Sequence, residues 1–377
     1  MTKPNSDRPG GWRLGQVAGI PIHVAPSWLF IALILVILYE PVVQSRLPDR
    51  PQSQTYVIAA VFVILLFVSV LAHELGHALV AKHFKIPVSS MTLWMLGGFT
   101  EMRREPKTPG QEFAISAAGP LISGVLGGLG VVGVVVIPHD AELWREVVAQ
   151  VAVSNVLITI FNLLPGLPLD GGALVRSGMW KLTGDRHRAT IAAGWTGRVV
   201  AVGVMAASLA FALWSSESGR GFSATGLIFT ALVCFFMWTA ATAAIRSATF
   251  AQRLPRLAAA ALARPAISVT AQVPLSEALR RGAEARASLV VVDALGEPAG
   301  LVNESAVRAT PEQRRPWVTV ADVARTLVPE ARISADLVGE SLLGALRRAP
   351  GQEYLVVRGN DVVGVLHASD ISAVLNN

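Results

Sequence analysis

The sequence predicts a polytopic α-helical membrane protein with six transmembrane helices, followed by a smaller α/β domain. Hydrophobic residues make up 52% of the 377 residues and charged residues only 15%, whereas a soluble domain carries about a quarter charged residues. Six apolar segments are long enough, or nearly long enough, to cross a bilayer, which takes about 20 residues. Beyond residue 246 charges become frequent and the apolar runs shorten to strand length.

The six apolar segments alternate with short loops whose charges indicate the topology. They run roughly over residues 26–39, 56–81, 113–137, 147–164, 191–214 and 222–244, and we expect the first to begin near residue 22. Sixteen lysines and arginines lie on the side of the N-terminus and four on the other side. Because these residues collect in cytoplasmic loops, we expect a multi-pass protein of the cell membrane with both termini in the cytoplasm.

This pattern predicts four parts along the chain. They are a cytoplasmic N-terminal segment (1–21), a six-span domain (22–250), a linker (251–263) and a soluble C-terminal module (264–377). The N-terminal segment is polar and lacks a short apolar core, so we expect no removable signal peptide. The net charge of +6 comes without a dense basic run, so no nucleic-acid partner is expected, and Cys234 alone allows no intrachain disulfide.

The second apolar segment contains the motif His73-Glu74-Leu75-Gly76-His77. Residues four apart share one face of a helix, so His73 and His77 can place two imidazoles on one zinc ion. Glu74 stands beside them and can take a proton from a metal-bound water. Hydration at a helix end is the alternative reading. Apolar residues continue the segment after His77, which argues against hydration at a helix end. Polar groups inside a membrane are costly unless they are paired or coordinated.

The third protein ligand that a catalytic zinc site usually has is expected after the fourth apolar segment. The run from Asn162 to Gly172 contains two prolines and three glycines, which break the helix. Irregular backbone at membrane depth is tolerated only where protein or water covers it. Asp170 emerges from this break on the same side of the membrane as the histidines, either as a zinc ligand or as the N-cap of a following helix.

Taken together, the HELGH and NLLPGLPLDGG motifs resemble the site-2 protease family of intramembrane zinc metalloproteases. The resemblance covers roughly residues 17–244 and implies that one Zn²⁺ per chain is held by His73, His77 and Asp170, with Glu74 activating the water. It also implies that Asn162 positions the substrate or stabilises the oxyanion; an interhelical hydrogen bond is the alternative role.

A Leu96-Gly97-Gly98-Phe99 segment resembles the short membrane-associated strand of the same family. Glycine lets another backbone approach closely, so Gly97 and Gly98 are expected to admit a substrate strand by strand addition. An ordinary turn is the alternative reading of this segment.

The C-terminal module contains a weak internal repeat. Residues 289–307 and 354–371 each show a β-branched strand, a turn, a second strand and a helix start, and an amphipathic helical stretch precedes each. This resembles a pair of cystathionine-β-synthase-type (CBS) domains, which implies an adenine-nucleotide site at Asp370. The second repeat has His367 where the family has a hydroxyl residue, and the first repeat lacks both ribose-binding residues. A structural pair that forms a homodimer therefore stays open, as does an N-cap role for Asp370.

These features predict an enzyme that cuts membrane-anchored protein substrates within the bilayer, as in regulated intramembrane proteolysis. The alternative is a non-catalytic membrane scaffold or transporter with a nucleotide-sensing CBS pair. A transporter requires ion ligands near the midplane, spread over broken helices, whereas this chain concentrates its buried ligands at one site.

Overall fold

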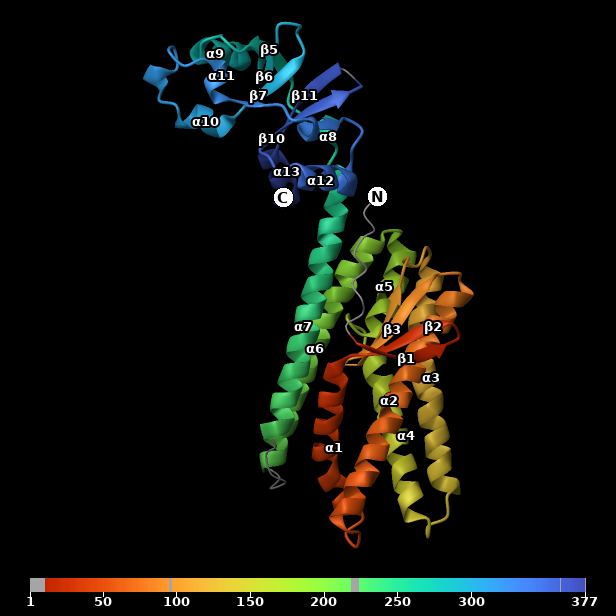
Figure 1. Ribbon diagram of the computed structural model, residues 1–377. Helices are drawn as coiled ribbons and strands as arrows, with labels where there is room; N and C mark the ends of the chain where they lie inside the picture. Colours follow the sequence, from red (N-terminus) through yellow and green to blue (C-terminus); the bar gives the residue numbers. More distant parts are fainter. Residues whose placement is uncertain (1–10, 95–96, 218–223, 360, 377) are drawn as a thin grey trace. The chain divides into compact units, whose positions relative to one another are not determined.

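The chain forms two compact units in the computed structural model, which describes residues 11–94, 97–217, 224–359 and 361–376. The first unit comprises Met1–Ala248 and the second Thr249–Asn377. Long helices and one sheet make up the first unit, and two sheets with short helices make up the second (Figure 1).

Six helices are long and apolar enough to span a membrane, which confirms the predicted class of a multi-pass helical membrane protein. They are α1 (Pro26–Arg46), α2 (Gln52–His83), α3 (Pro109–Val136), α4 (Glu142–Leu163), α6 (Arg186–Glu217) and α7 (Ala224–Arg253). Large apolar side chains on their outer faces are exposed, Val135 and Val136 to 78% and 73%, as a surface that faces lipid requires. A shorter helix, α5 (Asp170–Thr183), follows α4.

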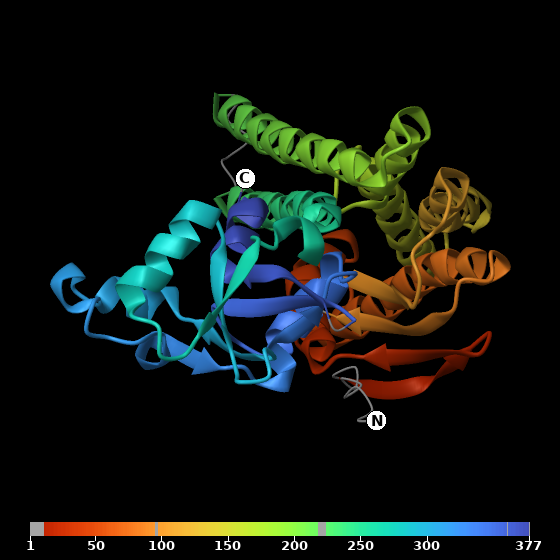
Figure 2. The same cartoon turned by 90° about the horizontal axis from the view of Figure 1, so that it is seen from above.

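A four-stranded sheet packs against α2. Its strands are β1 (Trp12–Val17), β2 (Ile20–Val24), β3 (Val88–Trp94) and β4 (Gly97–Met102), in the order β1-β2-β3-β4. Two antiparallel hairpins are joined by parallel pairing of β2 with β3, so the red hairpin lies beside the orange one in Figure 2. Strand β4 therefore forms one edge of this sheet.

The two N-terminal strands differ from the expectation of a polar segment that leads directly into the first span. Ile20 and Ile22 alternate with less buried neighbours and pack with Ala78 of α2 and Met91 of β3, so this face of β2 is buried against α2. Because residues 20–24 pair as a strand, the first transmembrane helix begins at Pro26 and not near residue 22. This correction follows from sheet pairing, which hydropathy alone does not reveal.

The chain breaks between α4 and α5 because Pro165 and Pro168 cannot continue a helix. The break packs closely on α6: a Cβ added to Gly166 would lie 2.4 Å from the Cα of Gly197. The backbone N–H of Leu167 donates to the carbonyl of Ala193 at 3.2 Å. Contact between glycine backbones therefore fixes the point from which α5 starts.

The second unit consists of two repeats of strand, helix, strand and strand, as the internal repeat predicted. The first repeat comprises β5 (Ala266–Thr270), α9 (Leu275–Ala285), β6 (Ser288–Val292) and β7 (Pro298–Val302), and the second β9 (Arg332–Ser334), α12 (Gly339–Arg348), β10 (Glu353–Arg358) and β11 (Asp361–His367). The sheets have the orders β5-β6-β7-β8 and β11-β10-β9. Their remaining elements are α10 (Glu304–Ala309), η2 (Glu312–Arg314), α11 (Val320–Val323), β8 (Ala324–Thr326), η3 (Pro329–Ala331) and α13 (Ala368–Asn376).

The segment expected to be a linker is structured. It contains the end of α7, a 3₁₀ turn η1 (Leu254–Arg256) and the short helix α8 (Ala259–Leu262). Leu257 and Ala259 are fully buried in the hydrophobic core of the second unit. Residues 254–263 thus form part of this unit's fold.

Candidate metal centre

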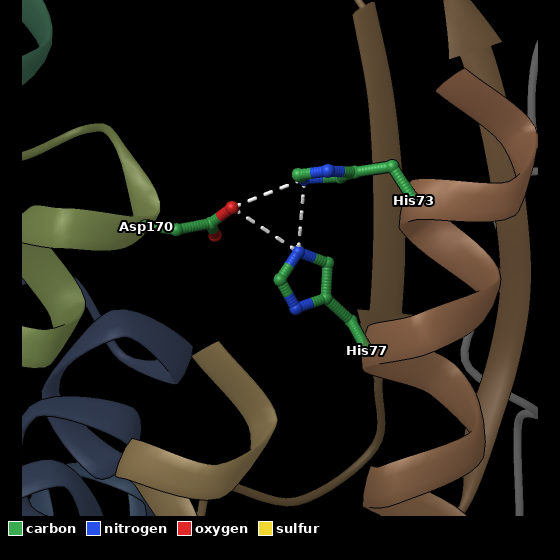
Figure 3. Close-up of side chains that lie close together, drawn as sticks. All are labelled: His73, His77 and Asp170. Carbon is green, nitrogen blue, oxygen red and sulfur yellow. Dashed lines mark hydrogen bonds and ion pairs between the residues drawn. The ribbon is translucent and has the colours of Figure 1, made fainter. Parts of the chain in front are cut away.

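Three potential metal ligands from two distant parts of the chain meet at one point. His73 and His77 lie one turn apart on α2, and both rings are buried, with exposed fractions of 5% and 7%. Asp170, the first residue of α5, approaches them from the opposite side (Figure 3). Its Oδ2 lies 3.1 Å from His73 Nε2 and 3.2 Å from His77 Nε2, and the two Nε2 atoms are 3.2 Å apart.

These distances fit a tetrahedral zinc site. Zinc bonds to histidine nitrogen and carboxylate oxygen are about 2.0–2.2 Å long, which places neighbouring ligands of a tetrahedron about 3.3 Å apart. Two nitrogens and one oxygen are also the donor set of a catalytic zinc, which keeps its fourth position for water or substrate. Among the described residues, these three form the cluster of histidine and carboxylate groups that suits a metal ion.

Helix α3 fixes the outer nitrogens of both imidazoles. His77 Nδ1 donates to the carbonyl oxygen of Ile115 at 2.7 Å, and because a carbonyl only accepts, Nε2 is left with its lone pair toward Asp170. His73 Nδ1 lies 3.0 Å from the hydroxyl of Ser123, which is fully buried. Such outer contacts orient metal-binding imidazoles and are a regular part of zinc sites.

Gly119 of α3 keeps the space beside the two rings open. A Cβ built at this position would lie 2.2 Å from His77 Nε2 and 2.6 Å from His73 Nε2, closer than nonbonded atoms approach. Any side chain here would displace the nitrogens that face Asp170. The backbone of α3 therefore lies directly against the two rings, and only glycine permits this contact.

Strand β4 lies directly on Glu74 and holds its carboxylate. The hydroxyl of Thr100 donates to Glu74 Oε2 at 2.7 Å. A Cβ at Gly98 would lie 2.2 Å from Glu74 Cγ, so this position has room only for glycine. Gly97 begins the strand with φ of +137°, a conformation that side chains rarely adopt, while Leu96 of the predicted motif lies outside the described residues. The two glycines thus belong to a strand and not to an ordinary turn.

Asn162, predicted to contact the substrate or the oxyanion, lies in the last turn of α4 and is half-buried. It makes no side-chain hydrogen bond within the described part of the chain. The interhelical hydrogen bond comes instead from Asn155, two turns earlier on the same face, whose fully buried amide donates to the hydroxyl of Ser69 on α2 at 2.9 Å. Sequence reasoning missed Asn155, although an amide within an apolar span was the available signal.

Asp370, the predicted nucleotide-binding residue, lies in the first turn of α13 in the second unit. Its carboxylate accepts two hydrogen bonds from the guanidinium of Arg264, at 2.7 and 2.9 Å. This ion pair raises the pKa of Arg264.

Comparisons with known proteins place the chain in a family. The sequence profile of peptidase family M50 matches residues 61–140 and 130–207. Over 382 residues the chain is 32% identical to Rip3 of Mycobacterium tuberculosis, named as a zinc metalloprotease, and the match covers 96% of this chain and 92% of the relative. A second relative named in the same way, sll0528 of Synechocystis, is 38% identical over 190 residues, which covers 49% of this chain and 48% of the relative.

Two solved structures are similar to parts of the chain. The site-2 protease of Methanocaldococcus jannaschii covers 62% of this chain and 95% of its own, with 26% identity and a TM-score of 0.43. A CBS domain of a membrane protein from Sphaerobacter thermophilus covers 34% of this chain and 94% of its own, with 18% identity and a TM-score of 0.28. For the second unit, the repeated order of strands and helices described above supports a CBS pair.

The profile match and the near full-length relative define a membrane-embedded metalloprotease that uses zinc. The chain belongs to peptidase family M50, the site-2 protease family.

Proposed function

We propose that the protein hydrolyses peptide bonds of membrane-anchored proteins within the bilayer, with His73, His77 and Asp170 as zinc ligands and Glu74 as general base. The observation that carries this proposal is the convergence of three ligand atoms, 3.1–3.2 Å apart, on a buried turn of a membrane-spanning helix that also bears Glu74.

Glu74 and Thr100 have separate roles in the proposed reaction. Zinc, when bound, acts as a Lewis acid that brings the pKa of a coordinated water to about 7. Glu74 accepts the proton of the attacking water and returns it to the leaving amine. Thr100 holds one carboxylate oxygen of Glu74 through the hydrogen bond at 2.7 Å, which leaves the other oxygen available for the proton.

The substrate backbone is expected to pair with the edge of β4. A strand edge offers unpaired N–H and C=O groups, and adding a peptide strand to such an edge is a common mode of recognition. Gly98 lies against Glu74 in this strand, so a paired peptide would pass close to the base. Asn162, in the last turn before the break that carries Asp170, is our candidate for contacting the substrate carbonyl or the oxyanion.

The orientation inferred from lysine and arginine places the metal cluster near the cytoplasmic side of the cell membrane. Water then reaches the site from the cytoplasm, while the substrate helix enters from the lipid. Protease accessibility of tags at the two termini, in sealed vesicles, tests this topology; a protected terminus in inside-out vesicles would contradict it.

Metal removal tests the proposal as a whole. The purified protein is expected to contain about one zinc per chain. Dialysis against a zinc chelator should remove both the metal and the cleavage activity, and stoichiometric zinc should restore both. The substrates for this assay are the membrane proteins that accumulate in cells expressing Glu74→Gln in place of the wild type, reconstituted with the purified protein in liposomes.

The same measurements separate the protease from the alternative of a non-catalytic scaffold or transporter. A protein without bound zinc, and without any accumulating membrane protein in Glu74→Gln cells, would support the alternative. Membership of peptidase family M50 favours the protease.

A cavity in the second unit supports the further proposal of adenine-nucleotide binding. It has a volume of about 420 Å³, and its lining includes Arg264, Arg286, Ser288, Arg308 and His367. Guanidinium groups suit the phosphates of a nucleotide. Arg264 and Arg308 are each 3.5 Å from the carboxylate of Glu304, which also lines the cavity, so Arg286 is the arginine that we assign to the phosphates. Asp370 contributes by holding Arg264 at the cavity wall through its two hydrogen bonds.

Calorimetric titration of the whole protein with ATP, ADP and AMP tests this site. Arg286→Gln is expected to weaken binding of the preferred nucleotide by about tenfold, the size of one hydrogen bond to a charged group. Asp361→Ala, an exposed carboxylate in the β10–β11 hairpin, is the control. If none of the three nucleotides binds, the CBS pair keeps its other predicted role as a dimerising module, which analytical ultracentrifugation in detergent measures.

A further inference from the structure

One face of α3 carries the three contacts with His73 and His77 described above. Ile115, Gly119 and Ser123 follow one another at intervals of four residues, so they lie in a row along the helix. Ile115 accepts from His77, Gly119 leaves room for both rings, and Ser123 contacts His73. All three act on the histidines of α2.

Glu112 continues this row, one turn before Ile115, but its side chain contacts α5 and α6. Its side chain is 2% exposed, which is rare for a carboxylate unless it is paired. It forms an ion pair with Arg176 of α5 and a second one with Arg186 at the start of α6, the latter at 3.3 Å. Glu112 therefore joins three helices at a buried point.

Arg176 lies on the same short helix as Asp170. The two residues are six positions apart, which corresponds to about 9 Å along an α-helix. Asp170 stands at the first position of α5, directly after the break, so the direction of its side chain depends on how α5 itself is held. In the described part of the chain, Arg176–Glu112 is the ion pair that joins α5 to α3.

We infer that Glu112 is a positioning residue for Asp170, because its ion pair with Arg176 fixes the rotation and tilt of α5 and so brings the third ligand to the two histidines. The inference rests on the proposed zinc site. Helix α3 then positions all three ligands, two through their ring nitrogens and the third through α5.

We expect the zinc affinity to fall when Glu112 loses its charge. Glu112→Gln keeps the shape of the side chain and removes the charge that Arg176 and Arg186 share. Loss of a group that directly contacts a metal ligand weakens metal binding by about 10- to 100-fold. Glu112 acts one step further away, through Arg176 and α5, so we expect the zinc dissociation constant to rise by about tenfold, the lower end of this range. Competition with a fluorescent zinc chelator measures this constant independently of catalysis.

A double-mutant cycle separates positioning of Asp170 from a general effect on the fold. If Glu112 acts through Asp170, adding Glu112→Gln to Asp170→Ala changes the remaining weak zinc affinity by less than about twofold, because coupled residues are not additive. A full effect of Glu112→Gln in the Asp170→Ala background would overturn the inference.

Two further variants guard against loss of folding and against unspecific charge effects. Arg176→Gln removes the same ion pair while Glu112 keeps Arg186, and it should weaken zinc binding similarly. Glu105→Gln is the matched control, because Glu105 is 78% exposed and its ion pair within the described residues is with Arg186; the zinc affinity of this variant should equal that of the wild type. Wild-type zinc affinity in both Glu112→Gln and Arg176→Gln would contradict the inference, whereas failure of the wild type to bind zinc would contradict the proposed function.

Discussion

Glu74→Gln is expected to abolish cleavage while the protein retains zinc. A general base contributes about 10²–10⁴-fold to the rate, and here one carboxylate serves both proton transfers, so we expect kcat to fall by about 10⁴-fold. The amide preserves the size of the side chain and accepts the hydrogen bond that Thr100 donates to Glu74. Zinc content should stay at that of the wild type, because Glu74 lies outside the ligand cluster.

The assay needs both readings on the same preparation. Cleavage of a reconstituted membrane substrate gives the rate, and elemental analysis gives the zinc content. Glu142→Gln serves as a control, since this carboxylate lies in the first turn of α4, at the end of the helix opposite the break. Retention of more than a tenth of the wild-type rate in Glu74→Gln would remove Glu74 from its assigned role.

Asp170→Ala is expected to lose both zinc and activity. The variant removes one of three protein ligands, and the loss should exceed the factor of about 100 that marks the upper range for outer partners. Asp170 Oδ2 is the sole carboxylate oxygen within 3.2 Å of both Nε2 atoms in the described residues. Without it, two imidazoles alone face the ion.

The matched control for this variant is Asp140→Ala, in the exposed loop between α3 and α4. Equilibrium dialysis against buffered zinc gives the dissociation constant of each protein. An unchanged constant in Asp170→Ala would show that the metal is bound elsewhere or by another carboxylate.

The three proposed ligands were accessible to sequence analysis because each carries a local signal. The spacing of His73 and His77 places them on one helical face, and the prolines before Asp170 mark a helix break. The local signals do not show that the two histidines and Asp170 meet in the folded protein. The resemblance to the site-2 protease family predicted this. The structure brings the three side chains together.

The supporting contacts were not predictable because they link residues far apart in the chain. Thr100 reaches Glu74 across 26 positions, and Glu112 reaches Arg176 across 64. A threonine in a short strand and a glutamate at a helix start have ordinary local explanations, so nothing in their neighbourhoods distinguishes them. Strand β1 was also missed; it is placed by its antiparallel pairing with β2, and all six of its residues are exposed.

If a substrate strand pairs with the edge of β4, as we propose, this pairing restricts which transmembrane segments the enzyme can cut. A peptide that pairs with this edge must give up its own helical hydrogen bonds over several residues. Segments rich in leucine keep those bonds, whereas glycine, proline or asparagine near the scissile position weakens them. The proposed pairing therefore predicts that the protein selects transmembrane segments whose helix unfolds readily at the depth of the site. Inserting a single helix-breaking residue should turn a resistant segment into a cleavable one.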